Sequence, residues 1–384
     1  MHFLYIAPRF HTNQIPIVKG LKENGFSVSF FSHYAGNIED YSYVQPEIIG
    51  YSPIFLCLNY IYTRVFRRND PMAMDKKLLL GFPPFFKLAK RLKRVKPDIV
   101  IIREKSVYSM VCYLLCRLYH FRAILYNQSP VYGKVKRDFM HRLVNSATPK
   151  VRMTPVMGKE TITDQKEEGT FFVPFVMEPE VAPEEKYFMR DGVIHILTVG
   201  KYEKRKNLIE MVKVFQSLEK EKPMVLTIVG ECSTGFHKAY YQALEQYIIE
   251  HNLSNKVRLM KNLSREDMKR EYQQADIFVL PSTREPASIS QLEAMAFSVP
   301  VICSDTNGSE CYVQQGHNGF LFRDNDMEDL KQKLMLFLQN DTLIVQMGTN
   351  SYYDVKNKYQ FKNYYEGIMA CIQYLEKLEK KDSL

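Results

Sequence analysis

Between residues 193 and 303 the chain alternates short apolar runs with stretches of helical period, and this alternation restricts the possible folds more than any other feature. The stretches of helical period place apolar residues three and four positions apart, as helices packed on a sheet do. Strands and helices in alternation predict a parallel, doubly wound α/β sheet. The apolar runs have the length of buried strands and lie at 193–199, 224–229, 257–260, 277–282 and 299–303.

The N-terminal half opens with the same pattern. Residues 2–7 and 26–31 are predicted strands, and the helix between them, 14–24, ends at Gly25. The loop after the first strand lacks G-x-G-x-x-G, so the dinucleotide-binding fingerprint is absent. We therefore predict two doubly wound, Rossmann-like domains that face each other across a cleft. The predicted boundaries are 1–178, 190–360 and a C-terminal helix over 361–384 that can cross back to the first domain.

Composition restricts the partners and the compartment. A hydrophobic fraction of 46% indicates a globular protein, and a net charge of +9 favours anionic partners. Such partners are nucleotide phosphates, acidic lipid headgroups or nucleic acid, and of these we expect the first two. Seven Cys without a C-x-x-C pair and nine His without H-x-x-x-H argue for a reducing cytoplasmic compartment and against a structural metal. No secretory leader and no membrane-spanning helix are predicted.

Two carboxylates, Glu285 and Glu293, bracket a predicted strand end, loop and helix start. Ser288 followed by Gln291 fits a capping box, which would start the helix at Ser288. From that start, Glu293 falls on an apolar stripe, where a carboxylate needs a partner. Two interpretations stay open: a buried ion pair with Lys or Arg, or a ligand contact. The stripe consists of Ile289, Leu292, Glu293 and Ala296.

Charged and small residues follow several strands of the second domain. Gly200 and the basic residues up to Lys206 follow the first strand, Glu285 follows the fourth, and residues 304–310 follow the fifth. The carboxyl ends of parallel strands share one edge of the sheet, so these loops should converge. Cations and helix N–H groups suit a diphosphate, and carboxylates suit the hydroxyls of a nucleotide-sugar. Taken alone, Arg205 and Lys206 also fit a solvated charge run.

Four segments at this spacing resemble the motifs of retaining glycosyltransferases of family 4, the glycosyl transferases group 1, which have the GT-B fold. The family's G-R-L-x-x-x-K loop matches 200–206, and its E-x7-E motif with E-A-M-A matches 285–296. Its A-x-G-x-P motif matches 297–300, and its G-x-x-E…G-x-N-G segment matches 308–319. The resemblance covers residues 193–322 well and the first domain only in pattern.

The resemblance implies a role for each matched residue. Lys201 and Lys206 would hold the donor diphosphate after Gly200, and with Glu285, near the transferred sugar, they form the implied catalytic set. Glu293 would accept the ribose hydroxyls. The remaining implied donor contacts are the N–H groups of Ser288 and Ile289, for phosphate, and the stretch 261–263, including Leu263, for the base. The implied reaction retains configuration and uses neither a metal nor a cofactor besides the nucleotide-diphosphate-sugar donor.

The chain departs from the family pattern at several positions. Lys201 stands where Arg is usual, and Ala287 and Ser288 stand where Phe and Gly are common. Ser298 replaces a Gly that often ends the preceding helix. In the first domain, Arg9 to Asn13 replace a glycine-rich acceptor loop, and Gln128 replaces a histidine. Candidates for the acceptor side are Arg9, His11, Asn13 and Gln128, with Arg103, Glu104 and Asn127 as further residues at strand ends.

Two stretches are aromatic and basic: residues 51–70, which end in Arg67, Arg68 and Asn69, and residues 83–96. The second predicts an amphipathic helix with Phe85, Phe86, Leu88, Leu92 and Val95 on one side. Either it lies on an anionic membrane surface, or it packs on the sheet with a solvated basic side. Together with the basic net charge, the two stretches favour a glycan or lipid-linked acceptor at the inner membrane face, in bacterial surface polysaccharide or lipopolysaccharide synthesis. Three alternatives to a glycosyltransferase stay open for the protein's function: a nucleotide-sugar 2-epimerase, a non-catalytic GT-B partner subunit or a glycosidase.

Overall fold

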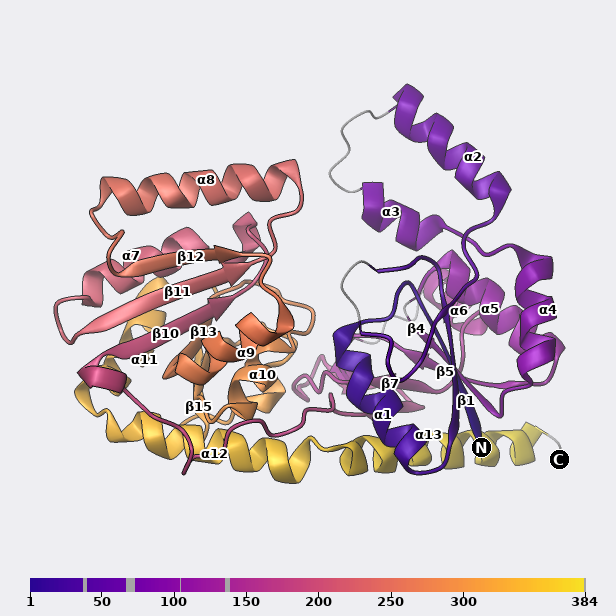
Figure 1. Ribbon diagram of the computed structural model, residues 1–384. Helices are drawn as coiled ribbons and strands as arrows, with labels where there is room; N and C mark the ends of the chain where they lie inside the picture. The colour runs from indigo at the N-terminus through magenta and orange to yellow at the C-terminus, as the bar shows by residue number, and fades with distance from the viewer. Residues whose placement is uncertain (37–39, 67–72, 104, 135–138, 383–384) are drawn as a thin grey trace. The chain divides into compact units, whose positions relative to one another are not determined.

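The computed structural model describes residues 1–36, 40–66, 73–103, 105–134 and 139–382 (Figure 1). The chain divides into two compact units, each an α/β unit around its own parallel sheet. Unit 1 comprises Met1–Val176 together with Phe361–Leu384, and unit 2 comprises Met177–Gln360. The C-terminal helix α13 (Phe361–Asp382) is therefore part of unit 1.

The sheet of unit 2 has the strand order β12-β11-β10-β13-β14-β15, and all of its pairs are parallel. In chain order this is the doubly wound 3-2-1-4-5-6 arrangement, which reverses direction between β10 and β13. Loops at the carboxyl ends of these two strands diverge to opposite faces, and ligands of such folds bind there. The strands are β10 (Ile194–Val199), β11 (Met224–Gly230), β12 (Val257–Lys261), β13 (Ile277–Leu280), β14 (Val301–Ser304) and β15 (Gly319–Phe322).

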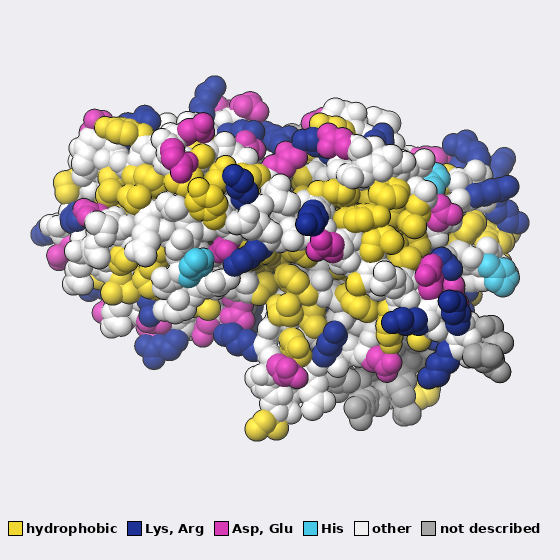
Figure 2. Space-filling view, turned by 90° about the horizontal axis from the view of Figure 1, so that it is seen from below, with side chains coloured by type: hydrophobic (Ala, Val, Ile, Leu, Met, Phe, Trp, Pro, Cys, Tyr) yellow, Lys and Arg dark blue, Asp and Glu magenta, His cyan; other side chains and the backbone are white. Residues whose placement is uncertain are grey.

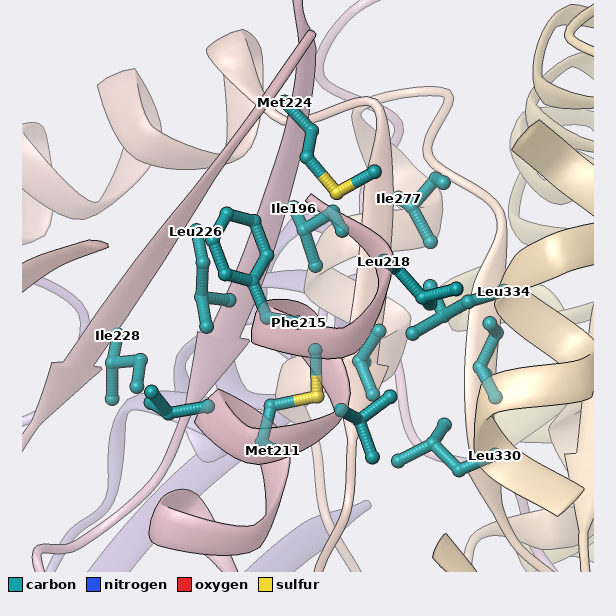
Figure 3. Packing of buried hydrophobic residues seen from close by; sticks show 14 of the residues in the cluster. Ile196, Met211, Phe215, Leu218, Met224, Leu226, Ile228, Ile277, Leu330 and Leu334 are labelled. Carbon is teal, nitrogen blue, oxygen red and sulfur yellow. The ribbon is translucent and has the colours of Figure 1, made fainter. Parts of the chain in front are cut away.

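Helices cover both faces of this sheet. On one face α7 packs Met211 and Phe215 against the strands, and Leu330 and Leu334 of α11 join the same cluster (Figure 3). On the other face Tyr272 of α9 contacts Phe278 of β13, and α10 is almost wholly buried. The helices are α7 (Leu208–Leu218), α8 (Gly235–Glu250), α9 (Arg265–Gln274), α10 (Ser290–Ala296), α11 (Met327–Gln339) and α12 (Thr342–Lys358).

Unit 1 is built the same way, with the parallel order β3-β2-β1-β4-β5-β7-β9 and a reversal between β1 and β4. The strands are β1 (His2–Ala7), β2 (Ser27–Ser32), β3 (Glu47–Ile48), β4 (Ile99–Arg103), β5 (Arg122–Tyr126), β7 (Arg152–Thr154) and β9 (Thr170–Phe172), with a separate antiparallel pair of β6 (Tyr132–Gly133) and β8 (Gln165–Lys166). The helices are α1 (Ile15–Glu23), α2 (Pro53–Ile61), α3 (Ala73–Leu80), α4 (Phe85–Val95), α5 (Val107–Leu118), α6 (Phe139–Ser146) and α13. Both units thus have the predicted doubly wound class.

Helix α13 completes the core of unit 1. Its Tyr364 hydroxyl lies 2.9 Å from the Tyr5 hydroxyl of the central strand, and both side chains are buried. At the far end of the helix, Arg122 of β5 pairs with Glu376 at 3.1 Å and with Glu379 at 2.8 Å. The helix therefore covers one face of the sheet, beside α1.

Helix α4 packs on the sheet, which is the second of the two interpretations of residues 83–96. Leu88, Ala89 and Leu92 are buried in a cluster with β4 and α5. The predicted apolar side is wrong at Phe86, which is 86% exposed, because the helix turns its 88–89–92 stripe to the sheet. Lys87 Nζ donates to the carbonyl oxygens of Ile48 and Ile49, at 3.0 and 2.8 Å, so part of the basic side is used within the fold.

The surface gives two further findings. None of the helices in the described ranges is long and apolar enough to cross a membrane. On the face shown in Figure 2, Lys and Arg side chains are interspersed with Asp and Glu. The net charge of +9 is therefore not gathered into one patch on that face.

The buried residue His33, which follows β2, should make the folded state of unit 1 less stable in acid. This residue is 5% exposed, and its ring stacks on Tyr108 with 3.6 Å between ring centroids. Burial lowers its pKa to about 3. The unfolded chain takes up this proton near pH 6.5 but the folded chain does not, so stability is lost as pH falls through this window.

Replacing His33 by Phe should remove that loss, which amounts to about 2 kcal/mol between pH 6.5 and pH 5 at about 1.4 kcal/mol per unit. Urea unfolding at pH 7 and at pH 5 measures the difference. An equal acid-induced loss of unfolding free energy in wild type and His33→Phe would contradict this account.

Candidate functional site

The strand order of unit 2 reverses between β10 and β13, and we call the carboxyl ends of these strands its switch point. The loops that follow β10, β13 and β14 meet there. A 3-10 turn, η4 (Lys204–Lys206), follows β10 and is joined to the loop after β13 by a hydrogen bond from the Thr283 N–H to the Arg205 carbonyl, at 3.0 Å. Asn207 Nδ2 donates to the Pro281 carbonyl at 3.0 Å. The convergence expected from the strand order is therefore present, and it brings opposite charges together.

Lys206 and Glu285 form the centre of this site. Lys206 Nζ lies 2.5 Å from Glu285 Oε2, and the side chains are only 8% and 10% exposed. Arg205 reaches the same oxygen from the surface side, at 2.7 Å. Burial lowers the pKa of Lys206 despite this pairing. Burial alone would raise the pKa of Glu285, but the attraction of Lys206 and Arg205 outweighs it and holds that pKa below its usual value.

Gly200 provides the space for Lys206. A Cβ atom at Gly200 would lie 3.1 Å from Lys206 Cδ and 3.3 Å from Cε, so the lysine stem runs across a position without a side chain. Lys201 points elsewhere. Its side chain is 51% exposed, and its Nζ lies 3.6 Å from Glu231 Oε2. Of the two predicted diphosphate ligands, Lys206 is fixed by the fold and Lys201 is a surface cation beside it.

The predicted capping box at Ser288 is wrong. Helix α10 begins at Ser290, two residues later, with Ile289 before it and no side-chain cap. The Gln291 side chain instead accepts from Asn307 Nδ2 at 2.9 Å and donates to the Ser309 carbonyl. Ser309 Oγ in turn donates to the Ser288 carbonyl at 2.9 Å. The glutamine therefore ties the helix start to the loop after β14, a partner about 18 residues away that no local pattern reveals.

Gly308 holds that loop against Glu285. Its N–H donates to the Glu285 carbonyl at 2.7 Å, and a Cβ atom at Gly308 would lie 1.8 Å from the Pro286 carbonyl oxygen. That neighbour is backbone, so it cannot rotate away. Gly308→Ala should shift the Glu285 loop and destabilise unit 2 by about 2 kcal/mol or more.

The matched control for Gly308→Ala is Gly235→Ala, at a helix start where nothing lies within 4 Å of the added Cβ. Thermal unfolding of both variants makes the comparison. Equal midpoints in Gly308→Ala and Gly235→Ala would show that the close approach at Gly308 has no energetic consequence.

Two interpretations were open for Glu293, an ion pair or a ligand contact, and in the structure its partner is a tyrosine. The Tyr272 hydroxyl donates to Glu293 Oε2 at 2.7 Å, and among the described residues no Lys or Arg pairs with this carboxylate. Burial raises the pKa of Glu293. The stripe prediction is also wrong in part, because Glu293 and Ile289 stay partly exposed while Ser290, Gln291 and Ala294 are buried.

Tyr272 was not among the predicted residues. Lys186 Nζ donates to its carbonyl at 3.1 Å and to that of Gln273 at 2.8 Å, which fixes the last turn of α9. A sequence signal for Tyr272 is its i+4 spacing from Met268, which places the two side chains on one side of the helix.

The remaining predicted donor residues lie near the same edge of the sheet. Ser288 and Ile289 are partly exposed just before α10, whose first N–H groups have no acceptor within the helix. Leu263 is partly exposed in the loop after β12.

Ser298, which stands where the family often has Gly, follows the end of α10. Its φ of 58° is a backbone position that favours Gly, and its Oγ donates to the Val181 carbonyl at 2.7 Å.

Unit 1 has a cavity of about 30 Å³ at its own switch point. Asn13 and Arg103 line it together with Tyr5, Tyr126 and mostly apolar residues. Asn13 Oδ1 is buried with no hydrogen-bond partner among the described residues, so it is available to a ligand hydroxyl. The other acceptor-side candidates, Arg9, His11 and Gln128, are partly exposed and do not line this cavity. Asn127 is bound to Arg152 at 3.0 Å, and Glu104 lies outside the described residues.

Comparison with known proteins identifies the segment that carries the unit 2 site. The model of the family described as glycosyl transferases group 1 matches residues 184–354, somewhat less than half of the chain. The matched segment lies within unit 2. The Lys206–Glu285 pair and the Glu293–Tyr272 pair both lie inside the matched segment.

Individual relatives extend the similarity beyond the matched segment. The capsular polysaccharide biosynthesis glycosyltransferase CapM of Staphylococcus aureus is 23% identical over 251 residues, 64% of this chain and 62% of CapM. A glycosyltransferase from Rickettsia africae ESF-5 superposes with a TM-score of 0.70 at 15% identity, covering 98% of this chain and 99% of that one. Anabaena Alr3699/HepE, solved with UDP and glucose, gives 0.68 at 12% identity over 97% and 100% of the two chains. The fold is thus that of GT-B glycosyltransferases, as predicted.

Proposed function

We propose that this protein is a retaining glycosyltransferase of family 4 that moves a sugar from a nucleotide-diphosphate-sugar to a hydroxyl acceptor. The observation that carries the proposal is the buried Lys206–Glu285 pair at the switch point of unit 2, inside the segment that matches the group 1 model. A buried cation fixed by a carboxylate suits the binding of a diphosphate, because it needs no reorganisation when the charge develops. The complex of Alr3699/HepE with UDP and glucose supports a UDP-sugar as the first donor to test.

In the proposed reaction the acceptor hydroxyl attacks the anomeric carbon on the face from which the diphosphate leaves. The bond between that carbon and the diphosphate oxygen breaks, the new glycosidic bond forms, and the leaving oxygen takes the proton of the acceptor hydroxyl. Lys206, Lys201 and the N–H groups of Ser288 and Ile289 stabilise the charge on the departing diphosphate. These groups supply the positive charge that a metal supplies in other transferases, so the proposed reaction is metal-independent.

The carboxylates have separate roles in this proposal. Glu285 orients Lys206 Nζ through one oxygen and offers its other oxygen to the hydroxyls of the transferred sugar. Glu293, with a raised pKa and a hydroxyl donor in Tyr272, accepts from the ribose hydroxyls. Gly200 and Leu263 border the diphosphate and the base. On the acceptor side, Asn13 is the best-supported residue because its oxygen is buried and has no hydrogen-bond partner in the described part of the chain.

The acceptor class is also part of the proposal. The similarity to CapM supports a role in bacterial surface polysaccharide synthesis. The acceptor that we propose is a glycan or a lipid-linked glycan at the inner face of the membrane. That assignment places the protein in the cytoplasm, in peripheral contact with the membrane.

Incubation with UDP-glucose and other nucleotide-sugars tests the proposal, first with donor alone and then with acceptor glycolipids and glycans. Transfer should need the acceptor and retain the anomeric configuration, as judged by NMR of the product. An epimeric sugar formed from donor alone would assign the site to a 2-epimerase. Donor binding without turnover across the acceptor panel would indicate a non-catalytic subunit.

A further inference from the structure

Helix α2 of unit 1 exposes a large apolar surface. Its sequence, PIFLCLNYI, contains no charged residue, and Figure 1 shows the helix standing out from the rest of unit 1. Only Phe55 is buried, against Tyr51 and Phe82. The exposed apolar side chains are Ile54 at 68%, Leu56 at 44%, Leu58 at 58%, Tyr60 at 56% and Ile61 at 46%.

The polarity of this helix is reversed relative to a helix in water. Its one amide side chain, Asn59, follows the buried Phe55 by four residues and so lies on the side that faces the protein. The opposite side, from Leu56 through Ile61 to Leu58, is apolar throughout. A solvated helix places its polar residues outward, so this one is suited to a non-aqueous environment.

Cations border the apolar surface. Arg64 of the following π-helical turn (Tyr62–Phe66) lies over the Tyr60 ring at 5.0 Å, and Lys76 of α3 lies over the Tyr62 ring at 5.9 Å. Residues 52–66 contain no Asp or Glu. Tyrosines and cations beside exposed leucines are the combination found where a helix meets anionic headgroups and acyl chains.

We propose that α2 inserts into the surface of a membrane that contains anionic lipids. Its apolar side enters the boundary of the acyl chains, and Arg64 and Lys76 contact the lipid phosphates. The charge of the segment favours a lipid surface over a second copy of this chain, since two equally basic segments repel. The proposal does not depend on the chemistry of unit 2, and it assigns membrane contact to α2 and not to α4.

Sedimentation of the full-length protein with vesicles tests this. Wild type should bind vesicles of phosphatidylcholine with phosphatidylglycerol, more weakly at high salt, and bind pure phosphatidylcholine much less. The triple variant Leu56→Gln, Leu58→Gln, Ile61→Gln should lose at least about 100-fold in vesicle affinity, because each buried leucine-sized side chain contributes about tenfold. A double variant, Arg64→Ala with Lys76→Ala, should lose mainly the preference for anionic vesicles.

The matched control is Leu114→Gln with Leu118→Gln on α5, two leucines that are 58% and 59% exposed in the same unit. The control should bind vesicles like wild type. Equal vesicle binding by the triple variant and the control would overturn the proposal. So would a concentration-dependent dimer, seen by analytical ultracentrifugation, that only the triple variant loses, because α2 would then be covered by a second copy. Either result leaves the sugar-transfer proposal intact, since no donor is present.

Discussion

The Lys206→Ala variant is expected to lose about 10³-fold or more in kcat/KM for sugar transfer. Lys206 is the cation that the fold holds at the switch point, and removing one preorganised group that stabilises developing charge costs about 10²–10³-fold. The variant also leaves Glu285 with Arg205 alone, which adds to the loss. Steady-state kinetics with a saturating acceptor measure the effect.

Loss of Lys206 also has a structural cost. Breaking a buried ion pair leaves an uncompensated charge, and we expect about 3 kcal/mol of destabilisation, reduced if Arg205 moves inward. Lys204→Ala is the matched control, because Lys204 lies in the same 3-10 turn with an exposed side chain. Wild-type turnover by the Lys206→Ala protein, or an equal loss in Lys204→Ala, would remove Lys206 from the proposed machinery.

The Glu285→Gln variant is expected to lose about 10²-fold or more in kcat while it keeps the shape of the side chain. The neutral amide no longer fixes the Lys206 ammonium, and burial then lowers the Lys206 pKa further. Transfer by this variant should therefore decline at a lower pH than in wild type, as Lys206 loses its proton. The pH profile of kcat/KM from pH 6 to pH 9 shows this shift.

A carboxylate that acts only as structural support would give a different result for Glu285→Gln. Stability would fall, but the pH profile of the folded enzyme would keep its wild-type alkaline limit. The control is Glu210→Gln in the first turn of α7, where the carboxylate is 42% exposed and pairs with Lys213 at 3.7 Å.

Much of the fold follows from local sequence patterns. Most strands of unit 2 agree with the predicted ranges within a residue or two, because buried strands and amphipathic helices have distinct periods. The strand order then places the loops after β10, β13 and β14 at one edge. For that reason Gly200, Lys206 and Glu285 could be assigned to one site before any distance was known.

The sequence could not show how these side chains pair. Three contacts join segments that are distant in the chain: Lys206 with Glu285, Tyr272 with Glu293, and Gln291 with residues 307 and 309. The capping-box error at Ser288 has the same origin, since Gln291 has a tertiary partner that competes with the local one. The sequence of residues 51–66 shows that this stretch is basic and aromatic. It does not show that the apolar side chains of the stretch are exposed, because exposure depends on the fold. Arg67, Arg68 and Asn69 of that prediction lie outside the described residues.

The central claim is that the switch point of unit 2 binds a nucleotide-diphosphate-sugar through Lys206. Isothermal titration of the full-length protein with UDP-glucose, UDP and a panel of other nucleotide-sugars tests it most directly, with Lys206→Ala and Lys204→Ala titrated in parallel. The account predicts a donor that binds wild type and Lys204→Ala equally and binds Lys206→Ala at least about tenfold more weakly, about 1.4 kcal/mol. Equal affinity in all three proteins, or no affinity for any nucleotide-sugar, would contradict it.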